Sequence, residues 1–178
     1  MMEALTTKVE ALETERLRGR PVCEADFDLL HGLHRDPRVM ATLGGLRDEA
    51  RTRQLLDMFM AHWGAMGFGI WMLFDRENGA FIGRAGLRCI EILGQAKVEV
   101  LYALLPDFWG RGLATEAAQA SVEVGFQEVG LPELVACTLK NNKASRRVME
   151  KAGFRYDRKF VYGELPHVLY RQRARTKV

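Results

Sequence analysis

The spacing of hydrophobic and polar residues along this chain alternates between helical and strand patterns, which predicts a mixed α/β domain. Apolar residues recur at helical spacing in segments such as 24–34 and 48–66, whereas shorter apolar runs are bounded by turn residues. The Asn78-Gly79 step between two such runs predicts a β-hairpin. The predicted helices are 24–34, 48–66, 113–129 and 144–152, and the predicted strands are 16–21, 68–75, 80–88, 95–105, 134–139, 154–162 and 168–172.

These elements follow one another in the order βαα-βββ-αβαββ, with no repeat or linker between them. Asp36-Pro37 is expected to end the first helix and Gly153 to terminate the last. Residues 1–13 carry no strong anchor and are expected to be a tail. We therefore predict one domain over 14–173, followed by a basic C-terminal tail over 174–178.

Composition narrows the class of protein. Of the 178 residues 48% are hydrophobic and 28% charged, as is usual for a globular domain, and the net charge of +3 is spread along the chain. This small excess is compatible with an anionic ligand but gives no argument for a nucleic-acid partner. No run approaches the ~18 apolar residues of a membrane span, and the N-terminus lacks a signal-peptide pattern. We expect a cytoplasmic protein with neither a nucleic-acid nor a membrane partner.

The cysteines and histidines do not form a metal-binding pattern. Cys23, Cys89 and Cys137 are far apart and lack C-x-x-C spacing, and the histidines form no H-E-x-x-H motif. Cys89 and Cys137 lie in apolar runs and are expected to be small core residues. We therefore predict no metal.

The most specific chemical signal is the turn before the predicted helix 113–129. Gly110 and Gly112 allow the backbone to approach a ligand closely, and the first N–H groups of the helix would point at an anion. Thr115 stands where a dinucleotide fingerprint needs its third glycine, and three consecutive strands precede the turn, so a Rossmann fold is excluded. The alternative is that the glycines serve only tight strand-to-helix packing.

Two ordered motifs give this turn a family context. Residues 99–117 read EVLYALLPDFWGRGLATEA, and residues 142–145 and 148–154 read NKAS and VMEKAGF. Both motifs resemble the acetyl-CoA-binding motifs of the Gcn5-related N-acetyltransferases, in the branch of the ribosomal-protein N-terminal acetyltransferases. The resemblance covers roughly residues 14–173. It implies an α+β fold, with a twisted and mostly antiparallel sheet of about six to seven strands, flanked by helices and splayed at a bulge in the strand 99–105.

The resemblance also implies how acetyl-CoA would be bound. The turn would offer N–H groups to the pyrophosphate, and the bulge at Leu104 and Leu105 would free main-chain groups for the pantetheine arm and the thioester. Asn142 would contact the same arm, with a simple turn-former before a helix as its alternative. The cofactor-binding residues implied in this way are Leu104, Leu105, Arg111, Gly112, Leu113, Ala114, Thr115, Asn142 and Ser145.

Two residues are candidates for the chemistry of amine acetylation. Glu99 would act as general base, directly or through water, because the attacking amine must be neutral; its alternatives are an exposed carboxylate or a partner for an arginine. Ser145 would assist the leaving thiolate, with a helix N-terminal hydroxyl as its alternative. Strand parity places Tyr102 on the face of Val98 and Val100, where it is expected to be a core residue.

We therefore expect an acetyl-CoA-dependent N-acetyltransferase that works by direct attack in a ternary complex, as a monomer or homodimer. The acceptor would be a protein N-terminus or a small-molecule amine. Leu101 and Ala103 depart from the family pattern and would reshape the acceptor pocket, while Arg84 and Arg88 are compatible with an anionic acceptor or with the 3′-phosphate of CoA. The alternative is a catalytically inactive acyl-CoA-binding sensor or partner-binding module of the same fold.

Overall fold

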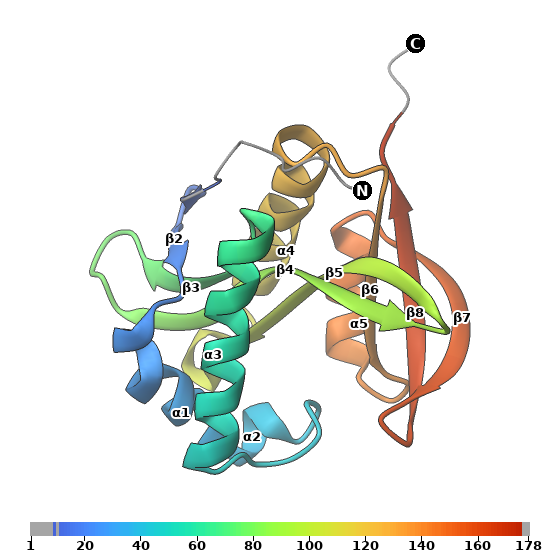
Figure 1. Ribbon diagram of the computed structural model, residues 1–178. Helices are drawn as coiled ribbons and strands as arrows, with labels where there is room; N and C mark the ends of the chain where they lie inside the picture. The colour runs from blue at the N-terminus through green and yellow to red at the C-terminus, as the bar shows by residue number, and fades with distance from the viewer. Residues whose placement is uncertain (1–8, 10, 176–178) are drawn as a thin grey trace.

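The structure is a computed structural model that describes residue 9 and residues 11–175. Its strands form one sheet in the order β1-β2-β3-β4-β5-β6-β8-β7 (Figure 1). The strands are β1 (Leu12–Glu13), β2 (Leu17–Pro21), β3 (Ile70–Asp75), β4 (Phe81–Ile92), β5 (Gln95–Leu104), β6 (Glu133–Leu139), β7 (Arg155–Tyr162) and β8 (Leu165–Arg173). The helices are η1 (Glu24–Asp26), α1 (Phe27–Arg35), α2 (Pro37–Met40), α3 (Glu49–Met66), η2 (Pro106–Phe108), α4 (Leu113–Glu123), η3 (Val124–Glu128) and α5 (Lys143–Lys151).

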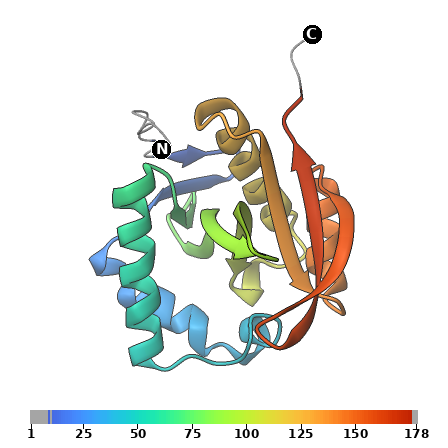
Figure 2. The same cartoon turned by 45° about the vertical axis from the view of Figure 1, so that its right-hand side comes forward.

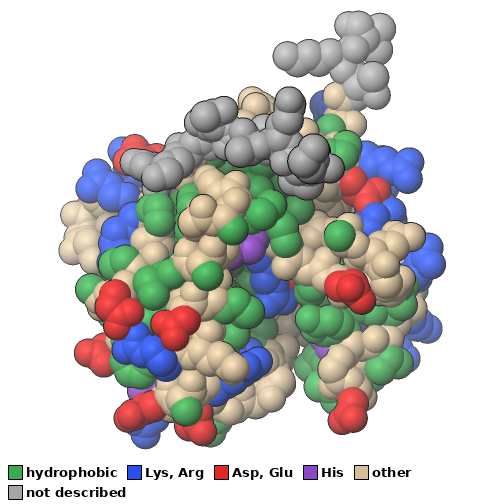
Figure 3. Space-filling model, viewed as in Figure 1, with side chains coloured by type: hydrophobic (Ala, Val, Ile, Leu, Met, Phe, Trp, Pro, Cys, Tyr) green, Lys and Arg blue, Asp and Glu red, His purple; other side chains and the backbone are tan. Residues whose placement is uncertain are grey.

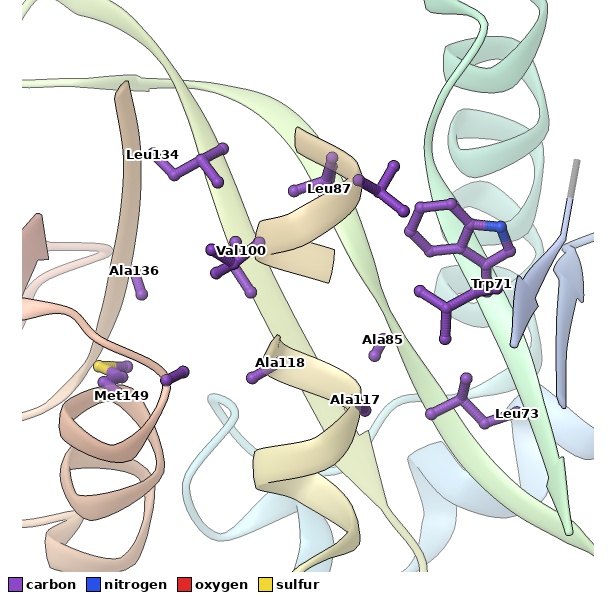
Figure 4. Packing of buried hydrophobic residues seen from close by; sticks show 14 of the residues in the cluster. Trp71, Leu73, Ala85, Leu87, Val100, Ala117, Ala118, Leu134, Ala136 and Met149 are labelled. Carbon is purple, nitrogen blue, oxygen red and sulfur yellow. The ribbon is translucent and has the colours of Figure 1, made fainter. Parts of the chain in front are cut away.

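Helices cover both faces of the sheet. Leu55, Leu56 and Phe59 of α3 pack with Ile70 and Met72 of β3 on one face. On the other face α4 and α5 contribute to the largest cluster, which Figure 4 shows from close by. Its labelled members are Trp71, Leu73, Ala85, Leu87, Val100, Ala117, Ala118, Leu134, Ala136 and Met149. This arrangement confirms the predicted α+β class, with eight strands in the described chain instead of six to seven.

The sheet divides at β5. The β4–β5 ladder is antiparallel and runs without a register shift from Ile92–Gln95 to Gly83–Leu104. In contrast, β5 and β6 are parallel and pair only at Glu99–Val135, so the β6-β8-β7 strands turn away from the rest of the sheet (Figure 2). The predicted splay therefore lies at the β5–β6 junction, and no bulge interrupts the ladder of β5 with β4.

The ends of several elements differ from the sequence-based expectation for local reasons. Leu12–Glu13 pairs with β2 and Leu12 is buried, so the folded domain begins before residue 14. Asp36-Pro37 does end α1, but Asp36 also caps α2, where proline at the first helical position costs no hydrogen bond. The helix predicted over 113–129 widens into a π-turn at Val124–Glu128. Residues 1–8 and 10 of the expected tail, and residues 176–178, lie outside the described residues.

Candidate active site

The turn between β5 and α4 leaves the helix with an uncapped N-terminus. Gly110 and Gly112 have left-handed backbones, with φ of 72° and 78°, and no described side chain caps the helix at Gly112. The first helical hydrogen bond runs from the Glu116 N–H to the Gly112 carbonyl (3.0 Å), so the N–H groups of 113–115 have no carbonyl within the helix. A Cβ built on Gly110 would meet nothing within 4 Å. These donors and the positive end of the helix dipole suit an anion.

A pocket of mixed charge adjoins this turn, because Glu15 and Glu116 line it together with Arg16 and Lys151. Its volume is about 370 Å³, and its lining includes Arg16, Gly112 and Lys151. Arg16 is fixed there, because its Nη1 donates to the Arg111 carbonyl (2.9 Å) and its Nη2 lies 2.6 Å from Glu116 Oε2. Arg16 and Lys151 could not be identified as site residues from the glycine motif, because both come to the turn from distant parts of the chain.

The divergence of β5 and β6 exposes main-chain groups at the end of β5. The Leu105 N–H donates to the Ile82 carbonyl (2.8 Å), which sets the antiparallel alternation so that the main-chain groups of Tyr102 and Leu104 face away from β4. The Leu104 carbonyl accepts a hydrogen bond from the Trp109 indole N–H (2.8 Å). The main-chain N–H of Leu104 is left directed into the gap. The structure thus separates the two predicted residues: Leu104 offers a donor to the gap, whereas the Leu105 N–H is already bonded.

Tyr102 and Ser145 bridge this gap. The Tyr102 hydroxyl donates to the Ser145 carbonyl (3.0 Å), and the two hydroxyl oxygens are 2.9 Å apart, so the Ser145 hydroxyl donates to Tyr102. Burial raises the pKa of Tyr102 well above its ordinary value, although the hydrogen bond with Ser145 acts to lower this pKa. Tyr102 is therefore more than the core residue that strand parity predicts, because its neutral hydroxyl reaches the predicted site residue Ser145.

Glu99 is buried at the last point where β5 still pairs with β6. It is 3% exposed, which rules out the exposed-carboxylate alternative. Arg88 Nε and Nη2 lie 2.8 and 2.7 Å from Glu99 Oε2, and the Cys137 thiol donates to Oε1 (3.0 Å). Burial opposes the charge of Arg88, but Glu99 outweighs it and holds the pKa of the guanidinium above its ordinary value. Glu99 is thus the carboxylate of a buried ion pair.

The remaining predicted residue, Asn142, caps α5. Its Oδ1 accepts from the Ser145 N–H (3.1 Å) and its Nδ2 donates to Thr138 Oγ1 (3.1 Å). Asn142 therefore caps the helix, in agreement with the alternative interpretation from the sequence. The same contact places Ser145 opposite Tyr102.

The two cysteines that were expected in the core differ in their exposure. Cys89 is exposed, so the prediction that it is a core residue is wrong, while Cys137 is half-buried against Glu99. Burial raises the pKa of the Cys137 thiol far above its ordinary value, with Glu99 adding to the effect. Among the described residues, no group of three or more His, Cys, Asp or Glu side chains could hold a metal ion. None of the helices in this part of the chain is long and apolar enough to cross a membrane.

The opposite side of β5 carries basic groups at the bottom of a hollow. Figure 3 shows Lys, Arg and His side chains there, between α3 and the strands β6 to β8. By strand parity this is the side of Glu99, Leu101 and Ala103 on β5 and of Arg84 and Arg88 on β4. The site therefore has a pocket for an anion at the N-terminus of α4 and a basic hollow across the sheet from α4.

Comparison with known proteins agrees with this architecture. The acetyltransferase (GNAT) domain model matches residues 16–155. The chain is 32% identical over 164 residues to the uncharacterized protein YkkB of Bacillus subtilis, covering 92% of this chain and 95% of YkkB. It is also 32% identical over 160 residues to the FsC-acetyl coenzyme A-N(2)-transacetylase of Aspergillus fumigatus, covering 84% of this chain and 67% of that protein.

Solved structures give the same result. The acetyltransferase from Agrobacterium tumefaciens superposes with a TM-score of 0.82 at 30% identity, covering 97% of this chain and 99% of that one. The fold also matches RimL, the ribosomal L7/L12 α-N-protein acetyltransferase in complex with coenzyme A, with a TM-score of 0.78 at 17% identity over 93% and 98% of the two chains. The chain belongs to the GNAT acetyltransferase family and is an N-acetyltransferase.

Proposed function

We propose that the protein transfers the acetyl group of acetyl-CoA to a primary amine by direct attack in a ternary complex. The observation that carries the proposal is the pairing of an uncapped α4 N-terminus with the unpaired end of β5. An anion-binding turn beside free main-chain donors suits a ligand with a pyrophosphate at one end and an amide-rich arm leading to a thioester. The acceptor is a protein N-terminus or a small-molecule amine. RimL is an example of the first kind, because its name gives the ribosomal protein L7/L12 as its acceptor.

Acetyl-CoA would lie along the turn and the gap. The N–H groups of 111–115 would hold the pyrophosphate, and Arg16 and Lys151 would add positive charge for the 3′-phosphate. The Leu104 N–H would receive the thioester carbonyl oxygen, where negative charge develops during attack. Asn142 would contact the pantetheine arm through an amide edge while keeping its cap on α5.

The reaction would need one proton acceptor and one donor to sulfur. The amine nitrogen forms a bond to the thioester carbon, the carbon–sulfur bond breaks, and the sulfur leaves as a thiolate. Glu99 would take the amine proton through a water molecule, because its Oε1 accepts only a weak thiol donor and keeps a free lone pair. Ser145 or Tyr102 would turn one hydroxyl hydrogen toward the sulfur.

Direct attack is favoured over a covalent acetyl-enzyme. The candidate nucleophile in the site is Cys137, and its raised pKa keeps it a thiol, which is a poor nucleophile.

The test of this function is a calorimetric titration with acetyl-CoA beside 3′-dephospho-CoA. We expect a micromolar dissociation constant for acetyl-CoA and weaker binding of the control, because Arg16 and Lys151 would lose the 3′-phosphate. Thiol release in the presence of a panel of primary amines then measures transfer. The proposal fails if acetyl-CoA does not bind, or if it binds and no amine releases CoA.

Tyr102→Phe tests the hydroxyl pair. The ring stays in its packing, but the bridge to Ser145 is lost, so kcat should fall about tenfold or more at an unchanged KM for acetyl-CoA. Tyr156→Phe is the matched control, because Tyr156 is 50% exposed on β7. Steady-state kinetics of thiol release check both variants, and an unchanged kcat in Tyr102→Phe would remove the hydroxyl pair from the mechanism.

A further inference from the structure

Arg84 is buried, and part of its guanidinium lacks a hydrogen-bond partner in the described part of the chain. The residue is 5% exposed, and its Nε and Nη1 are buried without a partner among the described residues. Its Cζ lies 5.5 Å from the centre of the Phe59 ring of α3, which positions it against the face opposite α4. An unpaired buried charge is costly, so this position points to a bound anion that would pair with the guanidinium.

A second arginine is held beside it by a chain of polar groups. Arg47 Nη1 donates to His34 Nε2 (3.1 Å), and His34 Nδ1 lies 3.1 Å from Thr52 Oγ1. Burial, with Arg84 and Arg47 nearby, lowers the pKa of His34 to about 3, so the ring is neutral and adds no charge. Its Nδ1–H then donates to Thr52, whose hydroxyl donates to His31 Nδ1 (3.3 Å). This chain fixes Arg47 as a cation at the hollow.

The local charges do not cancel. Burial, with Arg47 and Arg88 nearby, lowers the pKa of Arg84 to about 9, which still leaves it charged at neutral pH. Glu99 is the carboxylate that acts on Arg84, and it is already bonded to Arg88. Glu99 therefore acts on Arg84 and Arg88, and Arg47 adds a further positive charge beside them.

We propose that this arginine cluster, Arg84, Arg47 and Arg88, binds a carboxylate of the acceptor molecule, so that the enzyme acetylates amines that themselves carry a carboxylate. The proposal rests on the proposed function. Register supports it: Arg84 lies opposite Ala103, next to the Leu104 N–H assigned to the thioester, so an amine at the thioester and a carboxylate at Arg84 can belong to one molecule. The unbonded Nε and Nη1 of Arg84 are charged donors, and a carboxylate oxygen is a strong acceptor for such donors.

The experiment compares paired acceptors that differ only in the carboxylate. One arm uses free L-amino acids beside their amides, and the other uses amidated tripeptides with Glu or Gln as the second residue, which separates a free carboxylate from an acidic side chain. The enzymes are wild type, Arg84→Met and, as a matched control, Arg53→Met, because Arg53 also lies over a phenylalanine ring but is paired with Glu24 away from the cluster. Calorimetry of the N-acetylated products with CoA-saturated enzyme repeats the comparison without turnover.

Wild type should prefer the carboxylate member of a pair by about tenfold to a hundredfold in kcat/KM. That ratio should fall to near one in Arg84→Met and persist in Arg53→Met; Arg47→Met, which should lower the ratio, replaces Arg84→Met if that variant does not fold. Equal use and equal binding of both members by wild type, or a preference that survives the loss of Arg84, overturns the proposal. Absence of acetyl-CoA binding in wild type would instead overturn the proposed function.

Discussion

Gly112→Asp is expected to weaken acetyl-CoA binding by about a hundredfold or more. The new carboxylate would stand at the N-cap of α4, where the proposed pyrophosphate lies, and like charges in contact cost several kcal/mol. The same carboxylate would stand beside Arg16, because a Cβ built on Gly112 lies 3.6 Å from Arg16 Nη2, and would so compete with the ligand for this positive charge. Calorimetry with acetyl-CoA measures the loss.

Two further variants separate charge and backbone strain from the loss of the site. Gly112→Asn has nearly the same shape without the charge, so it should lose less affinity than Gly112→Asp. Gly130→Asp introduces the same side chain at a left-handed glycine (φ 75°) in open space outside the site, and should bind acetyl-CoA as wild type does. Aspartate and asparagine tolerate this backbone better than other residues, so each variant should fold. Normal binding by folded Gly112→Asp would refute the assignment of the turn.

Local sequence signals were sufficient for the parts of the fold that local chemistry decides. The hairpin at Asn78-Gly79 forms as predicted, with Gly79 at φ 75°, and the helix predicted from 48 begins after Asp48, which accepts from the Arg51 N–H (2.8 Å). Gly112 likewise opens a helix. In each case two or three neighbouring residues determine the conformation, so the conformation can be predicted from the sequence.

Contacts between distant segments could not be predicted in this way. Leu12–Glu13 is too short for a periodic pattern and becomes a strand only because β2 is beside it. Cys89 lies in an apolar run, but its position on β4 leaves it exposed. The cluster around Arg84 joins α1, the loop before α3, α3 and β4, and its excess charge is evident only once these elements are packed together.

The candidate site was predicted to a different extent for each kind of group. The resemblance supplied Glu99 and Ser145, but it did not supply their partners. Arg88 and Cys137 make Glu99 a buried, ion-paired carboxylate, and Tyr102 places a second hydroxyl beside that of Ser145. A motif identifies residues along the chain, whereas the groups that pair with those residues come from other strands.

Glu99→Gln should lower kcat/KM about a hundredfold or more at neutral pH, and the loss should shrink as the pH rises. Without a base, only the neutral fraction of the amine can attack, and this fraction grows toward the amine pKa, about 8 for an α-amine and about 10.4 for a lysine. The expected signature is a steep rise of kcat/KM with pH in Glu99→Gln and a flatter profile in wild type. Initial rates from pH 6.5 to 10 with one acceptor measure both.

Two matched variants distinguish a base from a structural partner of Arg88. Arg88→Gln breaks the same ion pair but keeps the carboxylate, so it should retain the wild-type pH profile even if its activity is lower. Glu133→Gln removes a carboxylate that pairs with Lys97 and Arg171 on the neighbouring strands, and should change neither rate nor profile. If Glu99→Gln and Arg88→Gln instead lose activity equally at every pH, the ion pair serves only to hold β4 and β5 in place. A water-mediated base at Glu99 predicts that only Glu99→Gln recovers activity at high pH, because the amine is then already neutral and the carboxylate is dispensable. A purely structural ion pair predicts no such recovery, because the pair is broken in both variants at every pH.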